Sequence, residues 1–193
     1  MRERKDIFIM DKKVLIANIL GTPDKADFSL QNFTYEERFA YLSIVSSLAW
    51  ADGSIDGREE NILNAIAKDS GPDIEKNLQK IINDTQKYNV ENFNKWVSMM
   101  TQQDMKVSLM IDMFQTAFAD KVYMKSEMIY MKYIAEKLGI GIVLYNDILK
   151  NIQIFMDSKE EEEDFNDDYP LPSAENTQGE KSFLQRIVKS IIN

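Results

Sequence analysis

Cysteine and histidine are both absent from this sequence of 193 residues. The lack of cysteine excludes disulfides, thiolate zinc sites and a cysteine nucleophile. The lack of histidine excludes Ser-His-Asp triads, imidazole metal ligands and the side chain that most often serves as a general base. Any metal held by this chain must therefore be held by oxygen atoms, which favours calcium, magnesium or manganese over zinc or copper.

Glycine and proline are scarce, with seven and four residues, which disfavours a many-turned β-sandwich or barrel. The hydrophobic and charged fractions, 44% and 28%, are those of an ordinary globular protein, and the length suits one well-packed domain. The apolar stretch 7–10 is interrupted at once by Asp11 and two lysines, so neither a signal peptide nor a spanning helix is expected there. We therefore expect a cytoplasmic protein.

A helical period of apolar residues runs through most of the chain as far as Met156. Helix starts are marked by capping patterns at Thr34, Asp56 and Asn89, and Gly71-Pro72 is expected to end one helix and begin the next. The sequence thus predicts an all-α fold, a compact bundle of about seven to eight helices over residues 1–156. The last three of these helices are expected over residues 104–119, 126–138 and 142–156.

The C-terminal part has a different character. Residues 157–180 carry ten acids and one lysine, a net charge of −9 that equals the charge of the whole chain, so the body is neutral. This composition predicts an acidic flexible linker over residues 157–181. Residues 182–193 then predict an amphipathic helix, too short to be stable alone, that docks on its own body or on a partner. Its apolar, partner-binding side consists of Phe183, Leu184, Ile187, Val188, Ile191 and Ile192.

An internal repeat is the most informative feature of the sequence. The stretch 50–59 (WADGSIDGRE) aligns with 118–127 (FADKVYMKSE) after a shift of 68 residues. In both copies an aromatic-Ala-Asp sequence ends one helix, and a glutamate seven residues after the aspartate lies in the first turn of the next helix. Two such helix-turn-helix units, packed about a pseudo-twofold axis, would place their acidic turns near each other.

The stretch 50–59, with its weaker copy at 118–127, resembles the tellurite-resistance TerB-like helical domain family, over roughly residues 36–154. The resemblance implies an all-helical bundle, found alone, in membrane-associated stress systems and beside DnaJ-type modules. It also implies that clustered acidic residues bind a divalent metal, with calcium or magnesium as the candidates. The metal-ligating positions carried over from the resemblance are Asp52, Asp56, Glu59, Asp120 and Glu127.

A purely structural interpretation of the same acids stays open. Asp56 and Glu59 form a complete capping-box pattern, and acids at helix N-termini are stabilising by about 0.5–1 kcal/mol without any ligand. The second copy departs from the first, because Lys121 replaces a glycine and Met124 replaces Asp56. An EF-hand is excluded, because its twelfth position, which requires glutamate, is a leucine.

No motif supplies a nucleophile with a base, or a glycine-rich phosphate loop, so an enzyme is not expected. The sequence instead predicts a non-enzymatic interaction or stress-response module that binds a divalent cation at its acidic turns. The alternative is an adaptor or inhibitor that acts solely through protein–protein contacts, without metal. The expected partner is a protein, or a second copy bound through the C-terminal helix. Nucleic acid is not expected as a partner, and membrane contact is peripheral at most.

Overall fold

The computed structural model describes residues 12–22, 28–50, 54–119 and 125–160. Within these ranges the chain forms nine α-helices and one short 3-10 helix, with no strand, so the predicted all-α fold is confirmed. The helices, in chain order, are α1 Lys12–Leu20, the 3-10 helix η2 Leu30–Asn32, α2 Tyr35–Ala49, α3 Gly57–Ser70, α4 Pro72–Glu75, α5 Leu78–Thr85, α6 Val90–Met99, α7 Gln103–Ala117, α8 Lys125–Lys137 and α9 Ile142–Glu160.

Two helix boundaries differ from the sequence prediction. The single helix expected to start at Pro72 is broken into α4 and α5, because Asn77 interrupts the regular hydrogen-bond ladder. Its backbone N–H donates to Ile74 O, a tight three-residue closure of 2.9 Å, and its side chain donates to Asp73 O at 2.7 Å. At the other end, α9 continues to Glu160, beyond the Met156 at which the sequence predicts its end.

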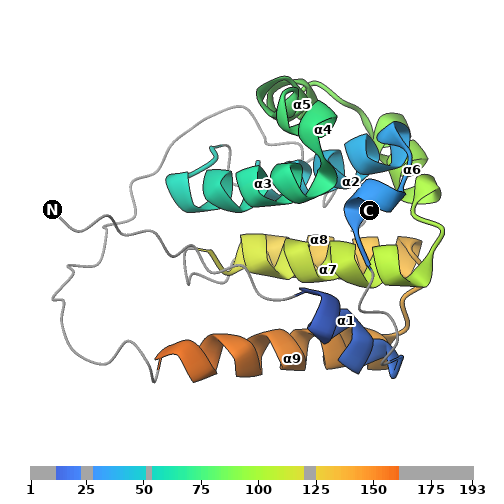
Figure 1. Cartoon of the computed structure of the whole chain (residues 1–193), viewed down its shortest axis with the longest axis vertical. Helices are drawn as coiled ribbons and strands as arrows, with labels where there is room; N and C mark the ends of the chain where they lie inside the picture. The colour runs from blue at the N-terminus through green and yellow to red at the C-terminus, as the bar shows by residue number, and fades with distance from the viewer. Residues whose placement is uncertain (1–11, 23–27, 51–53, 120–124, 161–193) are drawn as a thin grey trace, which may run out of the picture.

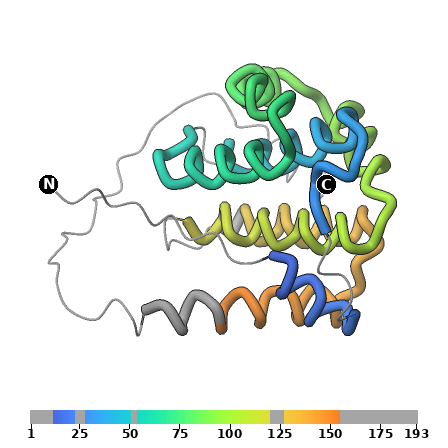
Figure 2. The backbone as a smooth tube through the Cα atoms, in the orientation of Figure 1, coloured from blue at the N-terminus to red at the C-terminus, as the bar shows by residue number. Residues whose placement is uncertain are grey.

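The helices lie in layers around two central members, α2 and α7 (Figure 1). α2 contacts α3, α4, α5, α6 and α7, and α7 contacts α1, α2, α3, α8 and α9. In Figure 1, α3 to α6 form the upper part, α7 and α8 the middle, and α1 and α9 the lower part. The tube in Figure 2 shows that α2 and α7 run in the same direction along the molecule.

The central helices are buried on all sides. Ten consecutive residues of α2, from 40 to 49, and eight of α7, from 107 to 114, are each at most 1% exposed. Phe39 and Trp50, on either side of the buried run of α2, are only partly buried. Over a run that is buried all round there is no polar face, so apolar periodicity in the sequence does not indicate which side of the helix faces which neighbour.

A buried polar cluster joins the two central helices. The carboxylate of Asp112 is 1% exposed and accepts a hydrogen bond of 2.6 Å from the Tyr41 hydroxyl, which also lies 2.8 Å from the Ser108 hydroxyl. The ammonium of Lys12, on α1, donates to the same carboxylate at 2.8 Å. Burial and the neighbouring Asp112 charge raise the pKa of Tyr41 well above its usual value, so this phenol stays a hydrogen-bond donor.

A second buried contact joins α2 to α8. The Ser47 hydroxyl donates to Ile44 O at 2.6 Å and lies 2.7 Å from the Tyr130 hydroxyl. Because the single hydroxyl proton of Ser47 is already used, Tyr130 is the donor between these two groups. Burial also raises the pKa of Tyr130. Both tyrosines therefore fix the position of α2 against its neighbours through directional bonds.

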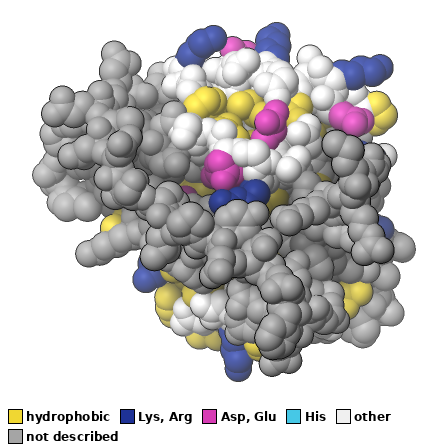
Figure 3. Space-filling view, turned by 90° about the vertical axis from the view of Figure 1, so that its left-hand side faces the viewer, with side chains coloured by type: hydrophobic (Ala, Val, Ile, Leu, Met, Phe, Trp, Pro, Cys, Tyr) yellow, Lys and Arg dark blue, Asp and Glu magenta, His cyan; other side chains and the backbone are white. Residues whose placement is uncertain are grey.

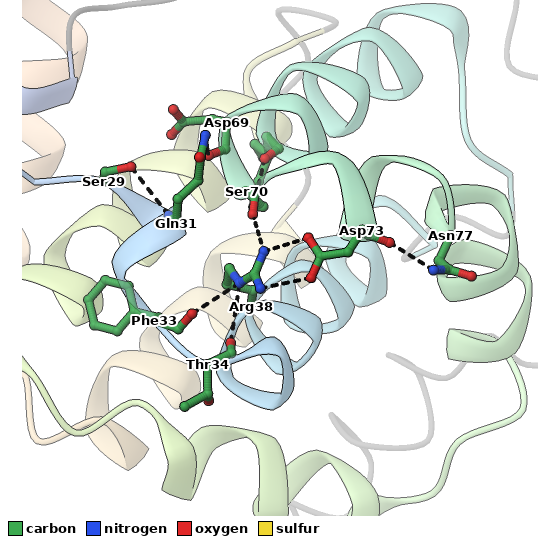
Figure 4. A network of polar contacts seen from close by, with 10 residues as sticks. Ser29, Gln31, Phe33, Thr34, Arg38, Asp69, Ser70, Asp73 and Asn77 are labelled. Carbon is green, nitrogen blue, oxygen red and sulfur yellow. Dashed lines mark hydrogen bonds and ion pairs between the residues drawn. The ribbon is translucent and has the colours of Figure 1, made fainter.

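An arginine clamp holds the beginning of α2 against the junction of α3 and α4 (Figure 4). The guanidinium of Arg38 donates to both carboxylate oxygens of Asp73, at 2.7 and 2.8 Å, and to the backbone oxygens of Phe33 and Ser70. Gly71 is adjacent to the Arg38 guanidinium and has a φ of +108°. A Cβ atom at this position would lie 3.0 Å from an Arg38 nitrogen. The clamp and the glycine together define where α3 ends.

Replacement of Lys12 by methionine tests the buried ion pair. We expect Lys12→Met to lower the free energy of unfolding by about 3 kcal/mol, because it leaves the Asp112 carboxylate buried without its cation. The control is Lys95→Met, at an exposed lysine of α6, which should change stability by less than about 0.5 kcal/mol. Urea unfolding followed by circular dichroism measures both. Equal effects of the two substitutions would contradict the role given to this ion pair.

Candidate functional site

The ends of four helices lie towards the same end of the fold. α2 and α7 both end, and α3 and α8 both begin, at the left-hand end in Figure 1. These ends flank the two repeated turns, whose residues 51–53 and 120–124 lie outside the described part of the chain. This common location follows from the shared direction of α2 and α7, together with the return of α3 and α8 along them.

In the first turn, Asp56 is the N-cap of α3 and forms the capping box that the sequence predicts. Its Oδ1 accepts from the backbone N–H groups of Arg58 and Glu59, at 2.7 and 2.9 Å. In return, the Asp56 N–H donates to Glu59 Oε2 at 2.8 Å. Partial burial raises the pKa of the Asp56 carboxyl, but the hydrogen bonds from Glu59 and Arg58 outweigh this, and the net shift is downward. These two acids therefore have a structural role in starting α3.

In the second repeated stretch, Glu127 lies in the first helical turn of α8, and the residue is 8% exposed. A carboxylate at this place is favoured by the unpaired N–H groups and the dipole of the helix. Its burial distinguishes it from Asp56, whose side chain is 43% exposed. Asp52 and Asp120, the first aspartates of the two repeated stretches, lie outside the described residues.

The described carboxylates alone do not form a metal centre. Within the described ranges, no group of three or more acidic side chains is spaced to hold a metal ion. Figure 3, which views the end that carries the turns, shows described Asp and Glu side chains separated by hydrophobic and uncharged ones. A site built from both turns therefore needs Asp52 and Asp120 as ligands in addition to Asp56, Glu59 and Glu127.

The predicted partner-binding side chains from Phe183 to Ile192 also lie outside the described residues, as does most of the predicted linker. Among the described helices, none is long and apolar enough to cross a lipid bilayer.

Sequence reasoning missed the buried cluster around Asp112. The available signal was a single acid inside the run LMIDMF, because a charged residue surrounded by apolar ones in a helix is buried only when it is paired. Its partner Lys12 lies 100 residues away, so no local pattern could identify it. Lys12 Nζ also lies 3.7 Å from Asp69 Oδ2, whose side chain is 46% exposed, so this lysine links the buried carboxylate of Asp112 to an acid at the surface.

No family model, curated protein or solved structure matches this chain. The resemblance to the TerB-like family therefore depends on the repeated stretches 50–59 and 118–127 of the sequence itself.

The capping role of Asp56 can be separated from any other role by two substitutions. Asp56→Ala should lower stability by about 1 kcal/mol, whereas Asp56→Asn, which keeps a side-chain acceptor, should change it by a few tenths. Because the pKa of Asp56 is lowered in the folded state, its carboxylate stabilises the fold above the ordinary pKa of 3.8. That contribution is lost as the pH falls through the lowered value.

Urea unfolding at pH 7 and at stepwise lower pH measures this effect. The difference between the wild type and Asp56→Ala should shrink as the solution is acidified. An Asp56→Asn variant as unstable as Asp56→Ala at neutral pH would contradict the capping role.

Proposed function

We propose that this chain is a non-enzymatic TerB-like interaction module of a stress-response system, controlled by a divalent cation. Calcium or magnesium binds between the two acidic turns, with oxygen ligands from Asp52, Asp56, Glu59, Asp120 and Glu127. The C-terminal segment 182–193 supplies the contact with a protein partner or with a second copy of the chain.

The observation that carries this proposal is the common location of the four helix ends. Carboxylates that are 68 residues apart in the sequence act on one ion only if both turns open at the same end of the fold. The proposal is supported by the ends of α2 and α7 and the starts of α3 and α8, which flank the two turns in the sequence and lie towards one end of the fold (Figure 1). Oxygen-only ligands from two loops are the ligand set that calcium accepts with flexible geometry.

The electrostatics of the first turn are compatible with a bound cation. Asp56 Oδ1 is engaged by the capping bonds, while Oδ2 faces Arg58 Nε at 3.4 Å. Both side chains are largely exposed, at 43% and 61%, and an exposed pair of this kind contributes at most about 1 kcal/mol. A divalent ion with several carboxylate ligands competes well against one exposed guanidinium. Capping and ligation can therefore use different oxygens of the same carboxylate.

The alternative function is an adaptor or inhibitor that acts solely through protein contacts, without metal. Two observations favour it. The Asp56–Glu59 box is complete without a ligand, and the second turn has Lys121 and Met124 in place of a glycine and an acid. In that case the body serves as a scaffold, and the acidic linker raises the local concentration of segment 182–193 around a partner.

A thermal-unfolding series separates the two functions. The wild type is unfolded in EDTA and then with calcium, magnesium and manganese, beside the variant Asp52→Asn/Asp120→Asn. A cation at about 100 times its dissociation constant should stabilise the fold by roughly 2.7 kcal/mol, which raises the midpoint by several degrees. The double variant should lose this rise. A matched control, Glu75→Gln/Glu91→Gln, removes two exposed carboxylates from the first turns of α4 and α6 and should keep it.

If no cation moves the midpoint of the wild type, the metal site is wrong and the adaptor function stands. A rise that persists in Asp52→Asn/Asp120→Asn would place the cation elsewhere and equally contradict the proposal.

A further inference from the structure

Helix α1 is held in place very differently from the central helices α2 and α7. Of its nine residues only Leu15 and Ile16 are buried, whereas ten residues of α2 and eleven of α7 are buried. α1 contacts α7 and α9, and it lies in the lower part of the fold beside α9 (Figure 1). Val14, on the same helix, is 56% exposed. α1 is thus a peripheral helix with one narrow buried side.

The sequence of α1 gives it little helical stability of its own. Nine residues are fewer than an isolated helix needs in water. Val14, Ile16 and Ile19 are β-branched, which lowers helix propensity. Lys12 and Lys13 lie in the first turn, where positive charge is unfavourable to the helix dipole, and this turn contains no acid. α1 is therefore helical because it is docked, and it should lose its helical structure when it leaves the body.

The C-terminal end of α1 is closed by a glycine. The backbone N–H of Thr22 donates to Ala17 O at 3.0 Å, and that of Gly21 donates to Asn18 O at 3.3 Å. Gly21 has a φ of +61°, so the two bonds form a Schellman motif. Within the described part, a Cβ atom at Gly21 would meet no atom within 4 Å. Replacement of this glycine by alanine therefore acts on the backbone of the motif alone.

The deepest polar contact of α1 is made by Lys12. Its ammonium lies 2.8 Å from Asp112 Oδ2 on α7 and 3.7 Å from Asp69 Oδ2 on α3, and its side chain is 12% exposed. Asp112 is buried, whereas Asp69 is exposed at the surface. Lys12 thus occupies the position between the buried carboxylate and solvent.

We infer that α1 is a latch, which opens as a unit while the other helices stay folded. Opening takes Lys12 away from Asp112, and water then reaches this carboxylate from the side of Asp69. A hydrated carboxylate avoids the cost of an unpaired charge in a dry core. Asp112 also keeps the hydrogen bond from Tyr41, so α2 and α7 remain joined after α1 has left.

The open state differs from the closed state in what it presents to other molecules. It uncovers the Asp112 carboxylate together with the sides of α7 and α9 that α1 covers. A molecule that binds this surface binds only the open state, so its affinity depends on the population of that state. The latch goes beyond the proposed function and is independent of the cation site.

Native-state hydrogen exchange followed by NMR tests the latch in the full chain, in EDTA and under conditions in which exchange reports the free energy of opening. We expect the amides of residues 16–20 to exchange at least about a hundredfold faster than the slowest amides of α2 and α7. Low concentrations of urea should leave the exchange of residues 16–20 nearly unchanged, because opening α1 exposes little surface. Exchange of residues 16–20 as slow as that of the central helices would overturn the inference.

A matched pair of glycine variants separates opening of α1 from unfolding of the whole body. Gly139 closes α8 as Gly21 closes α1: its φ is +71°, Ile140 N–H donates to Ala135 O at 2.8 Å, and within the described part a Cβ atom would meet no atom within 4 Å. Each glycine-to-alanine substitution destabilises the native state, so each should speed the slowest exchange of α2 and α7 by about five- to thirtyfold.

The two variants should differ in α1. Gly21→Ala should speed the exchange of residues 16–20 as well, whereas Gly139→Ala should leave it unchanged, because the strain at residue 139 is the same before and after α1 opens. If Gly139→Ala speeds exchange in α1 as much as in α7, α1 opens only when the whole body unfolds, and the inference is wrong. EDTA removes divalent cations, so failure of the latch leaves the proposed metal site standing, and the reverse also holds.

Discussion

The fold depends on a buried carboxylate between two helices that have no solvent-facing side. Apolar burial is itself non-directional, whereas a fully satisfied buried polar contact requires defined partners and so specifies one arrangement of the helices. Here Asp112 on α7, with Tyr41 on α2 and Lys12 on α1, supplies such contacts, and the bond between Ser47 and Tyr130 adds a second one. A buried charge stabilises only when it is paired, so the docking of α1 is coupled to the central pair.

The placement of the candidate site follows from that core. α2 and α7 run in the same direction, so both helices end, and α3 and α8 both begin, towards one end of the molecule (Figure 1). The Arg38 clamp fixes the C-terminal end of α3 against α4, and the Asp56–Glu59 capping box fixes the N-terminal end of α3. The described residues on either side of the two repeated turns therefore belong to well-anchored helices, to which the proposed ion ligands are attached.

Much of the fold could be predicted because its signals are local. The capping boxes at Thr34, Asp56 and Asn89 all form, since each needs only residues three positions apart. The division of α4 from α5 depends on one side-chain bond, and the Lys12–Asp112 pair spans 100 residues, so neither has a local signature. For the candidate site, the sequence correctly identified the N-cap of α3. The sequence also predicts that Glu127 is a metal ligand. The observed burial of this side chain neither requires nor excludes that role.

The most direct test of one cation site shared by both turns is an amide NMR titration of the full chain with calcium and with magnesium. A shared site predicts that resonances of residues 51–59 and 119–127 shift together, with one common dissociation constant, while those of α5 and α6 stay unchanged. Shifts in only one turn, different constants for the two turns, or no shift in either would contradict it. The acids would then act as helix caps alone.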